Sequence, residues 1–307
     1  MGLCHRSDYR IPTDVLAGLQ QLTYLELVGV KVKGPDPEAP ALQPLQALTA
    51  LADLRLALRE PAGIDSSLLA GMEDLTRLDL CNSAELEPSA LASIPQLQHL
   101  QLMQCSLTGG AAGVAQLLFQ LPHLSQVTHL DLSRSLTAVL EGNPPASAFS
   151  ALTASSKLQH LDLKGCKVPA AAWQHVFPAA GRQLPHLTTL NISAVSQPQG
   201  GAAAAPEGLV SCCPGLRSLD MQCLQVSAEL LLQLQRLSGL RTLFMSPTDA
   251  GEGLEAVGQV TGLQELFLYA PMTPFKLLLH FTQLRQLTSL SFVGKIETSS
   301  YFPGLNF

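Results

Sequence analysis

Three histidines recur in the same short context, each followed two residues later by a polar or acidic side chain. The segments are His99-Leu-Gln101, His129-Leu-Asp131 and His160-Leu-Asp162. An imidazole titrates near neutral pH, and a carboxylate within about 4 to 6 Å favours its protonated form and raises its pKa. Imidazole and carboxylate are also metal ligands. What these residues can do therefore depends on how the chain spaces them.

The spacing is set by a six-residue string with apolar residues at its first, fourth and sixth positions. The string occurs eleven times, beginning at Leu22, Leu51, Leu75, Leu97, Val127, Leu158, Leu187, Leu216, Leu240, Leu263 and Leu287. Self-similarity at this period predicts a stack of repeats. The alternation within each string predicts one strand per repeat, with its leucines pointing inward.

The segments between strings predict the return path of each repeat. In residues 65–75 and 227–237, apolar side chains recur at helical spacing behind Asp65 and Ser227, which can cap a helix. A helix between every two strands makes all strands parallel. Side chains at the same position of successive strings then form columns about 4.8 Å apart on one face.

The eleven strings resemble the leucine-rich-repeat superfamily over nearly the whole chain. The resemblance implies an α/β solenoid, a horseshoe with a curved parallel β-sheet on the concave side and helices on the convex side, as one domain of residues 1–307. The repeats in the middle of the chain, where the strings are farthest apart in the sequence, are similar to ribonuclease-inhibitor-like and cysteine-containing-type repeats. The long returns predict fuller helices there. At the ninth position, where the family has Asn or Cys, side chains such as Cys105 are expected to bond the turn backbone of neighbouring repeats.

The columns define candidate partner-binding residues on the concave face. They are Asp79, His99, Gln101, His129, Asp131, His160, Asp162, Asn191, Asp220, Phe244, Phe267 and Tyr269. Three interpretations of the His and Asp columns remain open. They are copied repeat units that solubilise the sheet, a surface complementary to a basic partner, or a metal site. We predict no metal, because ligands on a rigid sheet do not automatically converge on one ion.

The aromatic residues near the C-terminal end form a separate group. Phe244, Phe267 and Tyr269 occupy outward positions of predicted strands, where a ring has no core role. Aromatic side chains are enriched at the centres of protein interfaces. They predict either a contact patch or a surface covered by an extension of the chain.

Composition and motifs exclude several function classes. The net charge of −6, with 18 Lys and Arg, argues against nucleic acid and anionic membranes as partners. No GxGxxG, GxxxxGK[ST], HExxH or GxSxG string is present, so neither an enzyme nor a cofactor is predicted. We expect a non-catalytic module that binds another protein. Alternatives from resemblance are a substrate receptor of a ubiquitin ligase and a cytoskeletal or axonemal scaffold similar to green-algal leucine-rich-repeat proteins.

The expected location is the cytoplasm. Seven cysteines without a paired pattern fit reduced thiols, and no signal peptide or apolar run of about 18 residues occurs. Gly2 and Cys4 leave a weak alternative of N-terminal lipidation, because Arg6 replaces the Ser or Thr of the myristoylation pattern. Association with a ciliary axoneme follows from the resemblance alone. Residues 33–41 and 197–206 are predicted to be exposed loops, and residues 301–307 either cover the last string or lead into further chain.

Overall fold

The chain folds into two compact units, Met1–Pro144 (unit 1) and Pro145–Phe307 (unit 2). The computed structural model describes residues 10–34, 40–82, 84–140, 143–180, 182–246, 254–274 and 279–297. Gly2 and Cys4, residues 35–39 of the first predicted loop, and residues 301–307 lie outside this part. The single domain of residues 1–307 stays a prediction, so each unit is described by itself.

Every string forms one strand that begins at its third residue. Unit 1 contains β2 (Tyr24–Val28), β4 (Asp53–Ala57), β6 (Arg77–Cys81), β8 (His99–Met103) and β10 (His129–Asp131). Unit 2 contains β11 (His160–Asp162), β12 (Thr189–Asn191), β13 (Ser218–Met221), β14 (Thr242–Met245), β15 (Glu265–Pro274) and β16 (Ser289–Glu297). Neighbouring strands within each unit pair in parallel, third residue with third residue. The predicted columns are confirmed.

The inward residues of the strings form the core. From the second string to the tenth, every first, fourth and sixth residue is buried. The last string differs, because Leu290, its fourth residue, is 50% exposed. Removing apolar side chains from water contributes about 25 cal/mol per Å² of buried area, so the leucine triads supply the main stabilisation of both units.

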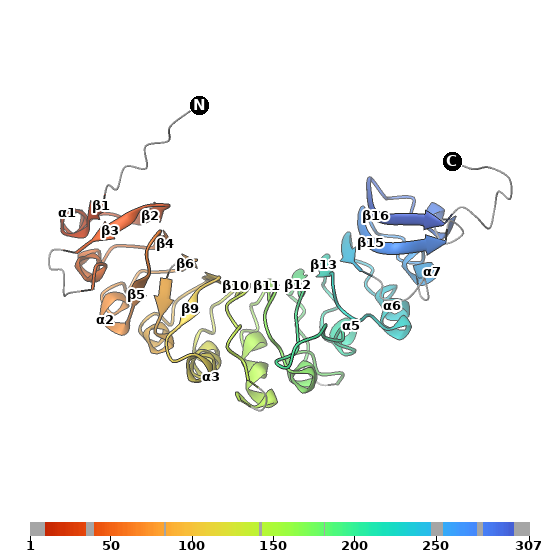
Figure 1. Ribbon diagram of the computed structural model, residues 1–307, viewed down its shortest axis with the longest axis horizontal. Helices are drawn as coiled ribbons and strands as arrows, with labels where there is room; N and C mark the ends of the chain where they lie inside the picture. Colours follow the sequence, from red (N-terminus) through yellow and green to blue (C-terminus); the bar gives the residue numbers. More distant parts are fainter. Residues whose placement is uncertain are drawn as a thin grey trace. The chain divides into compact units, whose positions relative to one another are not determined.

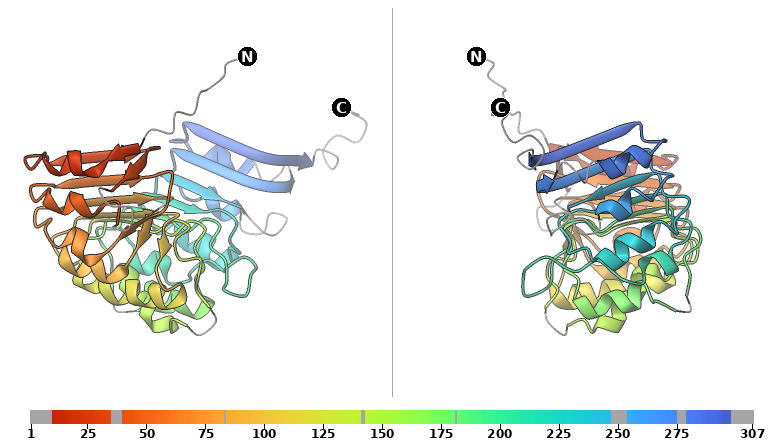
Figure 2. Two further views of the ribbon diagram at one scale, coloured as in Figure 1. Left: turned by 60° about the vertical axis from the view of Figure 1, so that its left-hand side comes forward. Right: turned by 90° about the vertical axis from the view of Figure 1, so that its right-hand side faces the viewer.

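Short helices return the chain along one face of the main strands and leave the other face uncovered (Figures 1 and 2). In unit 1 they are α1 (Thr13–Ala17), η1 (Gln43–Ala47), α2 (Ser66–Leu69), η2 (Pro88–Ser93), α3 (Ala111–Gln120) and η3 (Leu121–His123). In unit 2 they are η4 (Ala146–Thr153), η5 (Ala170–Ala172), α4 (Trp173–Val176), α5 (Leu209–Cys212), α6 (Ala228–Leu234), α7 (Leu254–Val257) and η6 (Leu279–Gln283).

Both helices predicted from caps are confirmed. Asp65 accepts the N–H of Leu68 at 2.9 Å at the start of α2, and Ser227 accepts the N–H of Leu230 at 3.2 Å at the start of α6. The prediction of fuller helices in the long central returns holds only for α3. The other long returns contain 3-10 turns, loops and the four-residue helices α4 and α5, because prolines and glycines such as those at 144, 145, 200 and 201 interrupt the helical path.

Two small parallel sheets flank the main strands and were not predicted. One pairs β1 (Arg10–Pro12) with β3 (Lys31–Lys33). The other, in unit 1, has the order β5 (Ala62–Ile64), β7 (Ala84–Leu86) and β9 (Ser106–Leu107). Except for β1, which precedes β2, these strands lie where the chain leaves the turn that follows a main strand. The predicted loop of residues 197–206 begins with a turn through Gly200 and Gly201, both at positive φ.

The turn after the main strands repeats one backbone geometry. The eighth residue of seven repeats has positive φ, namely Gly29, Asn82, Gln104, Arg134, Gly165, Ala194 and Cys223. In five of these turns its N–H donates to the carbonyl of the seventh residue of the next repeat, at 2.8 to 2.9 Å. The ninth position acts as the resemblance implied, because the Cys105 thiol donates to the Leu80 carbonyl at 2.9 Å. The Ser135 hydroxyl likewise donates to the Leu102 carbonyl.

We expect Ala194→Gly to raise the free energy of unfolding. Ala194 has φ of +53°, and this left-handed conformation costs a residue with a Cβ about 1 to 2 kcal/mol. The greater freedom of glycine in the unfolded chain offsets part of that gain, leaving a net increase of roughly 0.5 kcal/mol. Urea unfolding measures it. Ala202→Gly, at an exposed position with ordinary φ, is the control and should be destabilising. Equal effects of the two substitutions would refute the argument.

Candidate functional site

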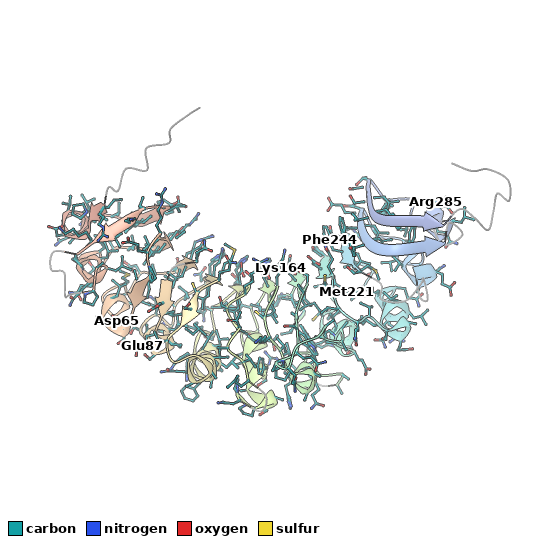
Figure 3. The ribbon with its side chains drawn as sticks, viewed as in Figure 1. Asp65, Glu87, Lys164, Met221, Phe244 and Arg285 are labelled. Carbon is teal, nitrogen blue, oxygen red and sulfur yellow. The ribbon has the colours of Figure 1, made fainter. Side chains whose placement is uncertain are left out.

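All twelve candidate residues lie on the face of their sheet that the helices leave uncovered, here called the open face of each unit. They occupy the third, fifth or seventh position of their strings, in the strands β6, β8 and β10 of unit 1 and β11 to β15 of unit 2. Figure 3 shows Lys164 and Phe244 on this side of unit 2, with Met221 between the sheet and the helices. The structure therefore places the candidates on two open faces, each described separately.

An ion-pair network occupies the first strands of the unit 1 open face. Arg55 donates to both carboxylate oxygens of Asp53, at 3.1 and 3.0 Å, and its guanidinium lies 5.2 Å from the centre of the Tyr24 ring. Arg77 lies 3.8 Å from Asp53 and 3.8 Å from Asp79. Asp79, predicted to meet a basic partner, is thus already paired with a cation of its own unit.

The next two strands bring two of the three histidines together. The rings of His99 and His129 are stacked, with centres 4.0 Å apart and an angle of 12° between their planes. Burial, followed by the positive charge of Arg77, lowers the pKa of His99. The expected effect of a carboxylate neighbour does not apply to His99, whose neighbour on the strand is the neutral Gln101. The shift favours the neutral form of the His99 ring over its charged form.

Four candidate residues at the fifth position of the strings, here called the acidic column, have a structural role that was not predicted. Each side chain accepts the backbone N–H of the residue two positions later, as in Asp131 (2.8 Å), Asp162 (2.8 Å), Asn191 (3.0 Å) and Asp220 (3.1 Å). Each is an Asx turn, in which a short polar side chain satisfies the backbone where the strand stops. The strands β10, β11 and β12 end at this residue and β13 ends one residue later, whereas β2, β4, β6 and β8 run two residues further.

The Asx turns reduce the capacity of the acidic column to bind a basic partner. Asp162 uses both oxygens, because its Oδ2 also accepts the Asn191 amide at 2.8 Å. Burial raises the pKa of Asp220 above its ordinary value, because it disfavours the charged carboxylate. Complementarity to a basic partner therefore receives little support from these residues.

We expect Asp162→Ala to lower the free energy of unfolding by about 2 kcal/mol, since two hydrogen bonds to a charged group are lost. Asp162→Asn keeps one acceptor for the Lys164 N–H and should cost about half as much. Urea unfolding followed by the fluorescence of Trp173, the one tryptophan of the chain, measures both. If the two variants were equally stable, the Asx turn would not be the role of this residue.

The three predicted aromatic residues form a continuous patch in unit 2. Phe244 on β14 and Phe267 on β15 are paired across the strands, with ring centres 5.8 Å apart. Tyr269 is 49% exposed and pairs with Val293 on β16, which is 45% exposed. We call these four residues the aromatic patch. Phe244 and Phe267 are partly exposed.

The described residues bear on two kinds of chemistry, metal ligation and thiol reactivity. No group of three or more His, Cys, Asp or Glu side chains in this part of the chain has the arrangement to hold a metal ion. The one half-exposed thiol of the unit 1 open face, Cys81, donates to Asp79 at 3.2 Å. Burial and this bond raise its pKa to about 12, so it is a thiol and not a reactive thiolate at neutral pH.

Sequence reasoning missed the residues that organise these faces. Asp53, Arg55 and Arg77 were not among the candidates, although their alternating charges in adjacent columns were a readable signal. The seventh position was noted only for Tyr269, yet it also supplies Val293 to the aromatic patch.

Comparisons with known proteins were made at the level of sequence and of structure. Neither the protein-family models nor the curated protein sequences gave a match. Solved structures do match. An internalin from Listeria monocytogenes has a TM-score of 0.61 at 18% identity, with 92% of this chain and 71% of that chain covered. A leucine-rich-repeat protein from Leptospira interrogans has a TM-score of 0.56 at 17% identity, with 95% and 74% covered.

A third similar structure is the Arabidopsis receptor kinase HAESA, in complex with the peptide hormone IDA and the co-receptor SERK1. Its TM-score is 0.56 at 16% identity, and the match covers 90% of the present chain and 43% of the receptor chain. Identities this low show the fold alone. The predicted α/β leucine-rich-repeat fold is confirmed, whereas the ribonuclease-inhibitor-like subtype stays a prediction.

Proposed function

We propose that this chain, which has the leucine-rich-repeat fold, is a non-catalytic module that binds another protein through the open face of unit 2. The observation that carries the proposal is the aromatic patch. Phe244, Phe267, Tyr269 and Val293 present apolar side chains on strand positions that contribute nothing to the leucine core. Buried aromatic anchors dominate the free energy of many protein interfaces.

The surroundings of the patch favour a partner that is mainly apolar at the contact. Asp220 lies beside Phe244 in register, and burial raises its pKa. Serine and threonine occupy the flanking positions of the paired strands, such as Thr242 and Ser291. Glu265, which pairs with Thr242, adds a carboxylate to this rim. A polar rim around an aromatic centre is the usual composition of a protein interface.

We expect the triple variant Phe244→Ala, Phe267→Ala and Tyr269→Ala to lose its partner. Purified tagged wild type and variant are incubated with extract of the source cells, and bound proteins are compared by quantitative mass spectrometry. Each truncated anchor costs about 1 to 2 kcal/mol of binding free energy, so recovery of the specific partner should fall at least tenfold. Partners recovered equally by both proteins would refute the proposed site.

Two controls separate lost contacts from lost folding. Tyr269→Glu changes only an exposed side chain and should give the same loss while unfolding like the wild type. The matched variant Val15→Ala, Phe119→Ala and Leu232→Ala removes exposed apolar side chains from the helices α1, α3 and α6. It should keep the partner.

We also propose a cytoplasmic location. It is supported by the six cysteines that the structure describes, all of which are free thiols, since structural disulfides are typical of oxidising compartments. No helix of the described residues has the length and apolar character needed to cross a bilayer. Imaging of a fluorescently tagged chain tests the location, and accumulation in a secretory compartment would contradict it. The ubiquitin-ligase and axonemal roles have no specific observation in their favour.

A further inference from the structure

The three-stranded small sheet of unit 1 has an edge at β9, where the following repeat is expected to add a further strand. Successive repeats contribute β5, β7 and β9 to this sheet, and Figure 1 labels β5 and β9 beside the helices of the unit. The next repeat contributes none, because residues 133–137 form a run of turns. The outer edge of β9 (Ser106–Leu107) is therefore not paired with a strand of that repeat.

The cause lies in the apolar spacing of the next repeat. Leu136 and Val139 are both fully buried, and they are three residues apart. A strand places side chains on one face at a spacing of two, whereas a tight helical turn does so at a spacing of three. Burying both side chains thus bends the chain away from β9.

A groove fills the space that results. Its volume is about 420 Å³, and Ser106 and Leu107 of β9 line it together with Thr137 and Ala138 of the next repeat. The buried Val114 of α3 also lines it. Sheet edges of this kind bind extended peptides, whose backbone pairs with the edge and whose side chains enter neighbouring pockets.

The charge of the groove indicates the composition of its ligand. Arg134 is the one charged residue of its lining, and within the described part of the chain it forms no ion pair. The remaining polar lining residues, including Gln104 and Thr137, are neutral. An arginine pairs most strongly with a carboxylate that accepts two of its N–H donors.

We infer that this groove binds an acidic peptide segment in extended conformation, which pairs with β9 as the fourth strand of the small sheet. The segment belongs to a partner protein, and its Asp or Glu side chain pairs with Arg134. This surface lies in unit 1 and is separate from the aromatic patch, so either can be tested without the other.

A random octapeptide library displayed on phage, selected against the full chain, tests the inference. The recovered peptides should be enriched in Asp or Glu flanked by β-branched residues. Synthetic copies measured by fluorescence polarisation should bind at least tenfold more weakly to Thr137→Glu, which places a like charge in the groove. Arg134→Asn should have a similar effect, and it is chosen because Asn tolerates the positive φ of this position.

The controls distinguish strand addition from other binding. Thr261→Glu, an exposed position in unit 2, and the Phe244, Phe267 and Tyr269 triple variant should both keep full affinity. N-methylation of alternate peptide backbone nitrogens should weaken binding at least tenfold. Recovery of no acidic peptide, equal binding to Thr137→Glu, or full displacement by millimolar inorganic phosphate would overturn the inference.

Discussion

Leu219→Ala is expected to lower the free energy of unfolding by about 3 to 4 kcal/mol, while Leu290→Ala lowers it by less than about 1 kcal/mol. Both leucines are the fourth residue of their string, on β13 and β16 of unit 2. Leu219 is fully buried, and Leu290 is 50% exposed. Truncation of a buried leucine loses its transfer free energy and leaves a cavity, whereas half of the Leu290 side chain is already in water.

The pair separates burial from sequence context, since the substitution and the position in the repeat are the same. Urea unfolding of each variant, followed by Trp173 fluorescence and by circular dichroism, gives the two free energies. In a solenoid each repeat is stabilised chiefly by its neighbours, so the last string carries less than an internal one. Equal losses would show that another part of the molecule covers Leu290 in solution.

The repeated strings allowed the strands, their register and the buried core to be predicted, because each depends on local alternation alone. His99 and His129 pair as the columns required, and the triads from Leu51 to Leu268 are buried. The same alternation predicted only that Asp131 and Asp162 point outward. Their Asx turns depend on the backbone beyond the strand, where the alternation carries no information.

The backbone conformation of the turns and the electrostatics of the candidate site could not be predicted, because both depend on contacts between repeats. Arg134, Ala194 and Cys223 adopt positive φ although their residue types disfavour it. At Ala194 the bond from its N–H to the next repeat holds the conformation, and this partner lies 28 residues away in the sequence. The pKa of His99 likewise depends on Arg77, which comes from the preceding strand. Such long-range effects were invisible in the pattern, while the aromatic patch was visible because Phe244 and Phe267 occupy adjacent rungs.

Gly113→Ala is expected to lower the free energy of unfolding by about 3 kcal/mol, although the same exchange stabilises an ordinary helix by about 1 kcal/mol. Gly113 is buried in α3. A Cβ at this position would overlap the carbonyl oxygen of Thr108 and lie 3.3 Å from the Cβ of Leu107. The nearest obstacle is backbone, which cannot rotate away as a side chain does, so α3 must move from β9 and the core must repack.

Gly63→Ala in β5 is the matched control. No atom lies within 4 Å of a Cβ built there, so the free energy of unfolding should change by less than about 0.5 kcal/mol. Urea unfolding followed by circular dichroism measures both variants. Equal stability of Gly113→Ala and Gly63→Ala would show that the helix does not approach Thr108 this closely. Because Leu107 lines the groove at β9, the same Gly113→Ala variant should also bind the acidic peptides less tightly, in proportion to the displacement of the edge.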